Sequence, residues 1–550
     1  MVLVLFLLLL VRASTSCQVA SFTECQQASF VPGHNLAGEG FDVVKMQTSG
    51  ASVIDVKTFM SGGVQGNCTV CHNPLLNQTQ KLPTSVLDWR VKVQCRRSLS
   101  SQVFESSQSV LKETSQSLGI HWKVGLSLPN LGGFAVGGSH STSSKFAESR
   151  SKKDKFSFTT HDFKCRYYTF RLHSRPPLSK DFHVSLQNLP TTFHHRNTSA
   201  FRHFISIYGT HFIRRVHLGG RVHSITAVRT CEASMYGLSV QAVSDCLSAE
   251  ANAAIDGAKV DAASSFCKKK RRSLKTGATF SQAFADRTTE VLGGDGDVGD
   301  ILFNPQGKKG YRKWLRSLRR VPGVVWYDIS PLHRLVSLRD AISDYIRQSA
   351  KPLRCPSRCK AGTQTRTCAC RCHGHRMVNA DCCPAEPGIA RMNVTVVRGE
   401  GLWGDYFSKT DGYVKVFYGG RSSVTPVIWN NNFPSWNYRI RLQTVNLRRR
   451  TPIRFEVWDR DNGWNDDLLG RAVLIPTVGS VQRKFRLNHG ALLVQVSAAC
   501  APSLQGALCQ QYLATPTYDR AMPTYNRATT AARGQHPGLR EAGVVTNSLN

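Results

Sequence analysis

Cysteine content constrains the fold of this chain more than any other feature of its sequence. The 550 residues contain eighteen cysteines, an even number that begins at Cys17 and predicts up to nine disulfides in an oxidising compartment. Seven of the cysteines crowd into residues 355–383. A segment this short cannot build an apolar core of its own, so we expect cross-links to hold it together. Because seven is odd, one of these cysteines is expected to pair outside the segment.

The first residues and the glycosylation signals both indicate secretion. Residues 1–11 form an almost unbroken apolar run that is short for a membrane span and is followed by small residues, so we predict a signal peptide over residues 1–16. No later stretch reaches the ~20 continuous apolar residues of a transmembrane helix. Four glycosylation sequons agree with export, at Asn67, Asn77, Asn197 and Asn393. We therefore expect a protein that is secreted, or stored in a secretory granule, in soluble form.

The formal charge of +35 predicts an acidic partner. Nucleic acid, an acidic proteoglycan and an anionic membrane all have the required chemistry, and secretion excludes nucleic acid. Solubility alone remains an alternative explanation of the charge. The chain also lacks the Gly-x-Ser-x-Gly, His-Glu-x-x-His and P-loop motifs of common enzyme classes, so we expect no enzymatic activity.

Hydrophobic periodicity predicts both strands and helices in the first 350 residues. Residues 121–128 alternate between polar and apolar side chains, which predicts a strand, and residues 155–159 repeat the pattern. Apolar residues spaced by three or four predict a helical stripe over 246–272 and an amphipathic helix over 331–350. Residues 501–550 are expected to form a largely disordered tail.

Residues 390–500 alternate as short strands separated by turn residues, which is typical of a β-sandwich. Two of the intervening loops carry five aspartates, Asp405, Asp411, Asp459, Asp461 and Asp467. If the loops meet at one end of the sandwich, five carboxylates repel one another unless cations lie between them. Calcium takes about six to eight oxygen ligands, so the pattern predicts a Ca2+ site.

This pattern resembles that of C2 domains, in which two aspartates of one loop and three of another bind calcium. The resemblance implies that Asp467, rather than Asp466, is the last ligand. Exposed aromatic rings beside such a site are costly unless something covers them, and Trp and Tyr favour membrane interfaces. We therefore expect four aromatic residues to bind a phospholipid membrane: Trp403, Tyr406, Phe407 and Trp464. Trp458 precedes the second acidic loop in a strand, and we expect it in the core.

A second motif lies earlier in the chain. Its five consecutive residues are Tyr208, Gly209, Thr210, His211 and Phe212. With the glycine pair that follows, the motif resembles the signature of the membrane-attack-complex/perforin family, and the resemblance covers about residues 17–500. It implies a pore-forming MACPF domain over 17–350, an EGF-like module over 351–386 and a C2 domain over 387–500.

The resemblance also implies a fold class and a mechanism. The fold is α+β, a bent antiparallel sheet with two helical clusters, which map here onto residues 103–162 and 246–290. In the family, monomers assemble into a ring or arc on the target membrane, and both clusters then unwind into amphipathic hairpins of a transmembrane β-barrel. The implied function is that of a calcium-dependent cytolytic protein. A non-lytic, calcium-dependent lipid or glycan adhesion protein of the same fold is the alternative.

Two further groups of residues have implied structural roles. Glycine tolerates backbone angles that other residues avoid, so we interpret two glycine pairs as hinges of the sheet, Gly219 with Gly220 and Gly293 with Gly294. The family resemblance implies four disulfides: Cys95–Cys165, Cys231–Cys383, Cys246–Cys267 and Cys500–Cys509. The second of these would account for the odd cysteine of the cysteine-rich segment.

Overall fold

The computed structural model describes most of the chain between Cys17 and Ala514. The described ranges are 17–62, 66–96, 99–119, 121–128, 133–256, 262–272, 274, 278–295, 301–303, 307–332, 335–355, 358–359, 361–373, 376–404, 406–461 and 465–514. The expected signal peptide and most of the expected tail lie outside these residues. Within the described part of the chain, no helix is both long enough and apolar enough to cross a bilayer.

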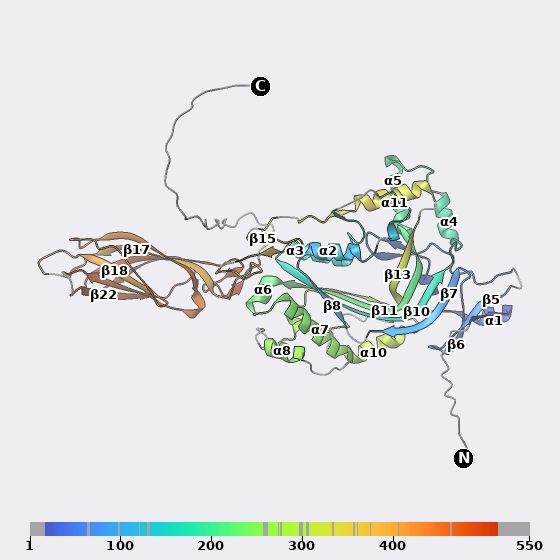
Figure 1. Cartoon of the computed structure of the whole chain (residues 1–550), viewed down its shortest axis with the longest axis horizontal. Coiled ribbons are helices and arrows are strands. Elements are labelled where there is room, and N and C mark those ends of the chain that lie inside the picture. Colours follow the sequence, from blue (N-terminus) through green and yellow to red (C-terminus); the bar gives the residue numbers. More distant parts are fainter. Residues whose placement is uncertain are drawn as a thin grey trace, which may run out of the picture. The chain divides into compact units, whose positions relative to one another are not determined.

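An eight-stranded antiparallel sheet forms the centre of the first 350 residues, and its two long middle strands run side by side (Figure 1). These are β10 (Phe156–Leu172) and β11 (His211–Arg229). The other strands are β3 (Glu39–Asp42), β4 (Gln47–Ser52), β7 (Val86–Cys95), β8 (Ser100–Phe104), β12 (Arg287–Leu292) and β13 (Gly323–Pro331). The order is β4-β3-β11-β10-β7; β8 also pairs with β10, and β12 and β13 pair with different parts of β11. The expected strand over 155–159 is confirmed as the start of β10.

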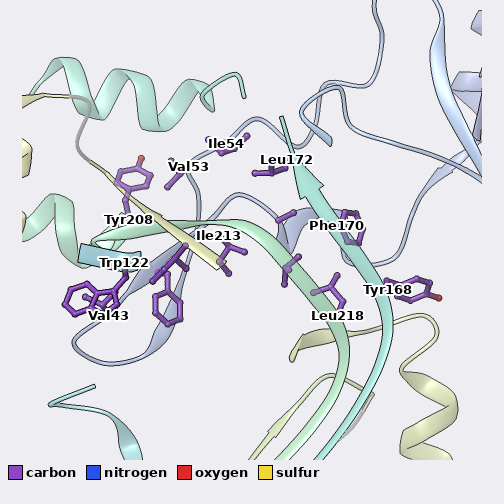
Figure 2. Close-up of a cluster of buried hydrophobic side chains, with 14 of the residues drawn as sticks. Val43, Val53, Ile54, Trp122, Tyr168, Phe170, Leu172, Tyr208, Ile213 and Leu218 are labelled. Carbon is purple, nitrogen blue, oxygen red and sulfur yellow. The ribbon is translucent and has the colours of Figure 1, made fainter. Parts of the chain in front are cut away.

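The main hydrophobic core lies against one half of these long strands (Figure 2). Phe170 and Leu172 of β10 and Ile213 and Leu218 of β11 contribute to it, and all four are buried. The helices that add side chains to this core include α4 (Lys180–Gln187), α5 (Thr198–Tyr208) and α11 (Val336–Gln348). Helix α11 confirms the amphipathic helix expected within 331–350.

The first helical cluster follows β8. Its elements are α2 (Ser107–Gln116), a short 3-10 turn η3 (His121–Lys123), β9 (Phe134–Ala135) and α3 (Thr142–Ser151). The strand expected over 121–128 is wrong, because the segment starts with this turn and Gly125 then has a positive φ of 83°. Trp122 is buried, but it packs into the main core from a turn and pairs with no strand.

The second helical cluster follows β11. It contains α6 (Thr230–Met235), α7 (Val240–Asp256), α8 (Ala262–Arg271) and α9 (Phe280–Ala283), and α10 (Gly307–Ser317) packs against α7. The helical stripe expected over 246–272 is confirmed in type but is divided between α7 and α8.

Disulfides fasten the small elements. At the start of the chain, β1 (Cys17–Ala20), α1 (Phe22–Gln27), β2 (Ser29–Phe30), β5 (Cys68–Asn73) and β6 (Gln78–Lys81) are held by the bridges Cys17–Cys71 and Cys25–Cys68. The cysteine-rich module contains β15 (Thr363–Gln364), β16 (Cys370–Arg371) and the bridges Cys355–Cys368, Cys359–Cys370 and Cys372–Cys382. Just before it, β14 (Lys351–Pro352) pairs with β9.

The last region is a sandwich of two four-stranded antiparallel sheets around its own core. One sheet has the order β20-β17-β24-β23, with β17 (Ile389–Glu400), β20 (Ser435–Asn446), β23 (Gly479–Arg486) and β24 (Ala491–Cys500). The other has the order β19-β18-β21-β22, with β18 (Gly412–Tyr418), β19 (Arg421–Val424), β21 (Ile453–Asp459) and β22 (Asp467–Leu474). A small hairpin of β25 (Leu504–Gln505) and β26 (Gln511–Tyr512) follows, so the described chain remains ordered beyond residue 500.

Candidate functional site

Strand register brings three of the expected calcium ligands to one end of a sheet in the sandwich. Asp411 directly precedes β18, Asp459 is the last residue of β21 and Asp467 is the first residue of β22. The register pairs Gly412 with Asp459, and Asp459 with Asp467. Because neighbouring strands are antiparallel, residues far apart in the sequence meet at this end.

Asp459 lies at the centre of this acidic end. It is buried, and its Oδ1 accepts a hydrogen bond of 2.6 Å from the backbone amide of Asp411. A Cβ on Gly404 would lie only 2.1 Å from Asp459 Oδ2, so the loop before β18 passes directly against this carboxylate. Burial of a carboxylate is costly unless donors or cations compensate its charge. The close approach of the loop and the buried carboxylate therefore fit a calcium ion.

The neighbouring aspartates are engaged differently. Asp466 Oδ1 accepts a hydrogen bond of 3.3 Å from the amide of Asp461, and its Oδ2 accepts one from the hydroxyl of Tyr413. Burial, together with this bond to Asp466, raises the pKa of Tyr413. Asp467 is exposed at the start of β22. Asp466 is thus bonded within the protein through both of its carboxylate oxygens, whereas the side chain of Asp467 is exposed.

The remaining part of the expected metal site is only partly described. Asp405 lies outside the described residues, as does Trp464. Among the residues that are described, no group of three or more His, Cys, Asp or Glu side chains is close enough to hold a metal ion. The described aspartates nevertheless supply carboxylate oxygens, the ligand type that calcium prefers.

The expected membrane-contact residues differ in how they are held. Tyr406 and Phe407 are essentially fully exposed, at 94% and 105%. The ring of Trp403 stacks on His489, with centroids 3.9 Å apart and planes within 1° of parallel. Trp403 is therefore braced by the sandwich, whereas the other two rings extend into solvent.

The expectation that Trp458 belongs to the core is wrong. Its neighbour Val457 is buried in the sandwich core, and side chains of a strand alternate between faces, so Trp458 points to the outer face of the sheet. There the Nζ of Lys415 lies 4.2 Å from its ring centroid. Trp458 is half-buried under this cation.

Sequence reasoning also missed two exposed aromatic residues at this end. Trp429 and Phe433 lie in the loop between β19 and β20, and both are exposed. The available signal was an uninterrupted run of uncharged residues from 425 to 436.

The second motif forms a junction between the sheet and the first helical cluster. Gly209 ends α5 with a φ of 75°, and a Cβ there would lie 2.6 Å from the backbone of Phe41. Thr210 Oγ1 lies 3.2 Å from the carbonyl oxygen of Phe41. His211 is completely buried, and its Nε2 lies 2.8 Å from the carbonyl oxygen of Trp122. Tyr208 packs against aromatic rings of α4 and α5, so the motif is a structural one.

Comparison with known proteins decides the family. The MAC/Perforin domain matches residues 31–354, and the C2 domain matches residues 390–485. Perforin-1 of Homo sapiens is 38% identical over 520 residues, which cover 90% of this chain and 93% of that protein. This chain belongs to the MAC/Perforin family. Perforin-1 of Rattus norvegicus is also 38% identical, with 92% and 95% covered, and the complement component C8 alpha chain of Oryctolagus cuniculus is 22% identical, with 64% and 66% covered.

Both glycine pairs of the MAC/Perforin domain lie where no side chain fits. A Cβ on Gly219 would lie 2.0 Å from the carbonyl oxygen of Cys165, and one on Gly293 would lie 2.3 Å from that of Gly219. Gly220 and Gly294 both approach the ring of Trp314. Gly293 and Gly294 also have positive φ angles of 80° and 89°. The two pairs therefore meet around one bend of the sheet.

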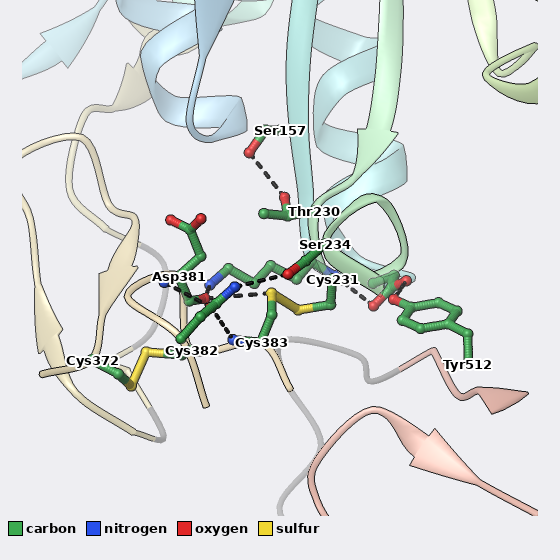
Figure 3. Close-up of a disulfide and its surroundings, with 12 residues drawn as sticks. Ser157, Thr230, Cys231, Ser234, Cys372, Asp381, Cys382, Cys383 and Tyr512 are labelled. Atoms are coloured by element: carbon green, nitrogen blue, oxygen red, sulfur yellow. Dashed lines mark hydrogen bonds between the residues drawn. A yellow bond between two sulfur atoms is a disulfide. The ribbon is translucent and has the colours of Figure 1, made fainter. Parts of the chain in front are cut away.

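The structure forms all four disulfides that the family resemblance implies: Cys95–Cys165, Cys231–Cys383, Cys246–Cys267 and Cys500–Cys509. Figure 3 shows the second of them, which joins α6 to the cysteine-rich module. Beside it, the side-chain amide of Asn379 donates to Ser234 Oγ at 2.8 Å, and the hydroxyl of Tyr512 donates to Asp154. The odd cysteine of the module is thus accounted for.

The four sequons lie in different surroundings. Asn67 and Asn77 are exposed. Asn197 is half-buried, and its side-chain amide donates to the carbonyl oxygen of Thr192 at 2.7 Å. Asn393 is half-buried within β17. Asn67 and Asn77 therefore offer the most accessible side chains for a glycan.

Proposed function

We propose that this chain is a secreted, calcium-dependent cytolytic protein that assembles on a target membrane and forms a transmembrane pore. The single observation that carries the proposal is the combination, in one chain of the MAC/Perforin family, of an acidic C2 loop end with two helical clusters that pack on the same strand pair. Such a chain needs no catalytic residues, because its work is binding and rearrangement.

Membrane docking is assigned to the acidic end of the sandwich. Calcium would be held there by five aspartates: Asp405, Asp411, Asp459, Asp461 and Asp467. When bound, the ion neutralises these carboxylates and adds positive charge that attracts lipid phosphate. The chain's own contribution is to present the loop aromatics beside these carboxylates: Trp403, Tyr406, Phe407 and Trp464.

The packing of the helical clusters supports the proposed rearrangement. The helices of the first cluster pack on a small hydrophobic core that is separate from the main core, and most of the second cluster packs on another. In α3, the buried side chains are only Ser144 and Ala147. Little apolar burial holds such a helix, so local opening costs less than opening the main core. After homo-oligomerisation into a ring or arc, both clusters, 103–162 and 246–290, would unwind into hairpins.

The glycine bend would then act as the hinge. Gly219, Gly220, Gly293 and Gly294 allow the strands to pass one another at distances that any side chain would block. The flattening of this bend is the motion that we assign to insertion.

Storage and partners follow from the charge and the disulfides. We assign the protein to the secretory pathway and to cytolytic granules, with glycans at the four sequons. The large positive charge suits an acidic proteoglycan as a partner in those granules.

Calcium-titrated dye release from phospholipid vesicles tests the proposal. The full chain should release dye in calcium and lose this activity in a chelator. The double variant Asp459→Asn/Asp461→Asn should lose most of the activity, because it removes the negative charge of two proposed calcium ligands. Asp88→Asn/Asp340→Asn, which removes the same charge from surface ion pairs of the MAC/Perforin domain, is the matched control and should release dye normally.

Two results would overturn the proposal in different ways. Equal release with and without the chelator would remove the calcium requirement. Calcium-dependent vesicle binding without any release, and without rings in electron micrographs, would indicate the non-lytic adhesion protein instead.

A further inference from the structure

We propose that the loop between β19 and β20, residues 425–434, is an additional membrane-contact element that presents Trp429 and Phe433 to the lipid bilayer. We call it the second loop; the first loop is residues 401–411 and the third is residues 460–466. The inference rests on the proposed function, because it adds contacts to the membrane-docking end of the same sandwich.

Exposure is the first observation. Trp429 is 64% exposed and Phe433 is 67% exposed, although both rings are large and apolar. They lie four residues apart on one turn, which is shaped by a hydrogen bond of 2.8 Å from the amide of Phe433 to Asn431 Oδ1. Large exposed rings that gather on one turn mark an interaction surface.

The second loop is bonded directly to the calcium end. The amide of Asn430 donates to Asp411 Oδ1 at 2.6 Å, and the amide of Asn431 donates to the carbonyl oxygen of Thr410 at 2.8 Å. Asn432 accepts at its side-chain oxygen from the amide of Thr410, at 3.0 Å. Three consecutive asparagines therefore fasten the second loop to the first, and any surface that the calcium end approaches also meets Trp429 and Phe433.

The chemistry of the loop selects lipid as the occupant. No charged side chain occurs from residue 425 to 436, although 19% of all residues in the chain are charged. Entry into the interfacial layer would therefore bury no charge from this loop. The exposed side chains of Arg439 and Arg441 follow on β20 and suit the phosphates of anionic headgroups. The occupant that fits an uncharged aromatic turn followed by cations is a bilayer with anionic lipid.

Vesicle binding of the full chain tests the inference. The probe is phosphatidylcholine vesicles, with and without phosphatidylserine, in calcium. The double variant Trp429→Ala/Phe433→Ala should bind at least roughly tenfold more weakly, because two rings no longer enter the interface. Phe22→Ala/Trp326→Ala is the matched control: these rings are 44% and 45% exposed, they lie outside the sandwich sequence, and the control should bind normally.

Fluorescence gives a readout that does not depend on affinity. Brominated lipid chains should quench bound protein, and Trp429→Phe should lower the quenched fraction while the melting temperature stays unchanged. Equal binding and equal quenching of variant and unmodified protein would overturn the inference alone. A dimer in vesicle-free solution that is lost in Trp429→Ala would overturn it in favour of a second copy of the chain. If the unmodified chain does not bind vesicles in calcium, the proposed function itself fails.

Discussion

The two helical clusters cover opposite faces of the same strand pair, and the two faces have different chemistry. Phe156 and Phe158 of β10 face the first cluster and share a small core with its side chains. The intervening residues face the second cluster through hydrogen bonds: Ser157 Oγ lies 2.9 Å from Thr230 Oγ1, and Thr159 Oγ1 lies 2.6 Å from Ser244 Oγ. Because side chains alternate along the strand, β10 packs the first cluster on an apolar face and the second cluster on a face rich in hydroxyl groups.

The two clusters pack largely independently of each other. The first cluster has no core without the sheet, because most of that core belongs to β8, β10 and β11. The second cluster carries its own core, which includes Leu247 of α7 and Phe280 of α9, and the disulfide Cys246–Cys267 closes it. Among the described side chains of α6 to α9, those that join the main core are Ala251 and Ile255, at the far end of α7. The second cluster can therefore separate from the sheet with most of its interior intact, losing Val228 of β11, whereas the first loses most of its interior when it separates.

Deleting one buried ring beneath each cluster should destabilise that cluster strongly. Phe158→Ala should cost about 3–5 kcal/mol of local stability and speed amide exchange in α2 and α3. Phe280→Ala, an equally buried ring of the second cluster, should speed exchange in α7 and α9 by a similar factor. Hydrogen–deuterium exchange of both variants measures this. If either variant opened all the helices equally, the clusters would be one cooperative unit.

Acid should weaken the second cluster more than the first. His161 is completely buried, its Nε2 lies 3.3 Å from the carbonyl oxygen of Ser244 in α7, and burial lowers its pKa to about 4. The charged and titratable groups that act on it are Arg287, Asp162 and His223. An unfolded histidine titrates near 6.5, so below this pH the open state binds the proton more tightly than the packed one. Stability is therefore present above pH 6.5 and is lost as the pH falls toward 4, by roughly 2 kcal/mol at pH 5.

Exchange measured at pH 7 and pH 5, corrected for intrinsic rates, tests this titration. The α7 amides should open more readily at pH 5, and His161→Gln should remove the dependence because glutamine does not titrate. An identical pH response in α2 and α3, or an unchanged response in His161→Gln, would contradict the assignment.

The sequence predicted the secondary-structure elements of both regions better than the surfaces against which these elements pack. The strands of the sandwich, α11 and the helical character of α7 and α8 were predictable, because burial repeats along each with the period of its structure. Polar and apolar residues also alternate over residues 121–128, but this pattern indicates only which side chains are buried. It does not show whether another strand lies beside the segment to pair with it. Trp122 is buried by a turn that bonds to His211, a contact between residues 89 positions apart that no local pattern encodes.

The candidate site likewise contains residues that the sequence predicted and residues that it did not. The five aspartates were recognisable because their spacing is unusual, and strand register accounts for why three of them lie at one end of the sheet. The position of Trp458 was also predictable in principle: Phe455 and Val457 are core residues, so the next residue of the strand must face outward. Trp429 and Phe433 were missed because they carry no motif, and their exposure depends on hydrogen bonds between loops.

An ion pair joins the two clusters, so their packing is not completely independent. Arg150 of α3 donates from Nε to both carboxylate oxygens of Asp286, at 2.9 and 2.8 Å, and Asp286 directly precedes β12. Arg150→Met keeps the side-chain stem and removes the charge, so it should cost about 1 kcal/mol and speed exchange in α3 and in β12 together, roughly fivefold. Arg90→Met, which breaks an exposed pair with Asp88 on β7, should leave both segments unchanged. If exchange in α3 rose while β12 stayed protected, Arg150 would stabilise only its own helix, and the clusters would be uncoupled at this point as well.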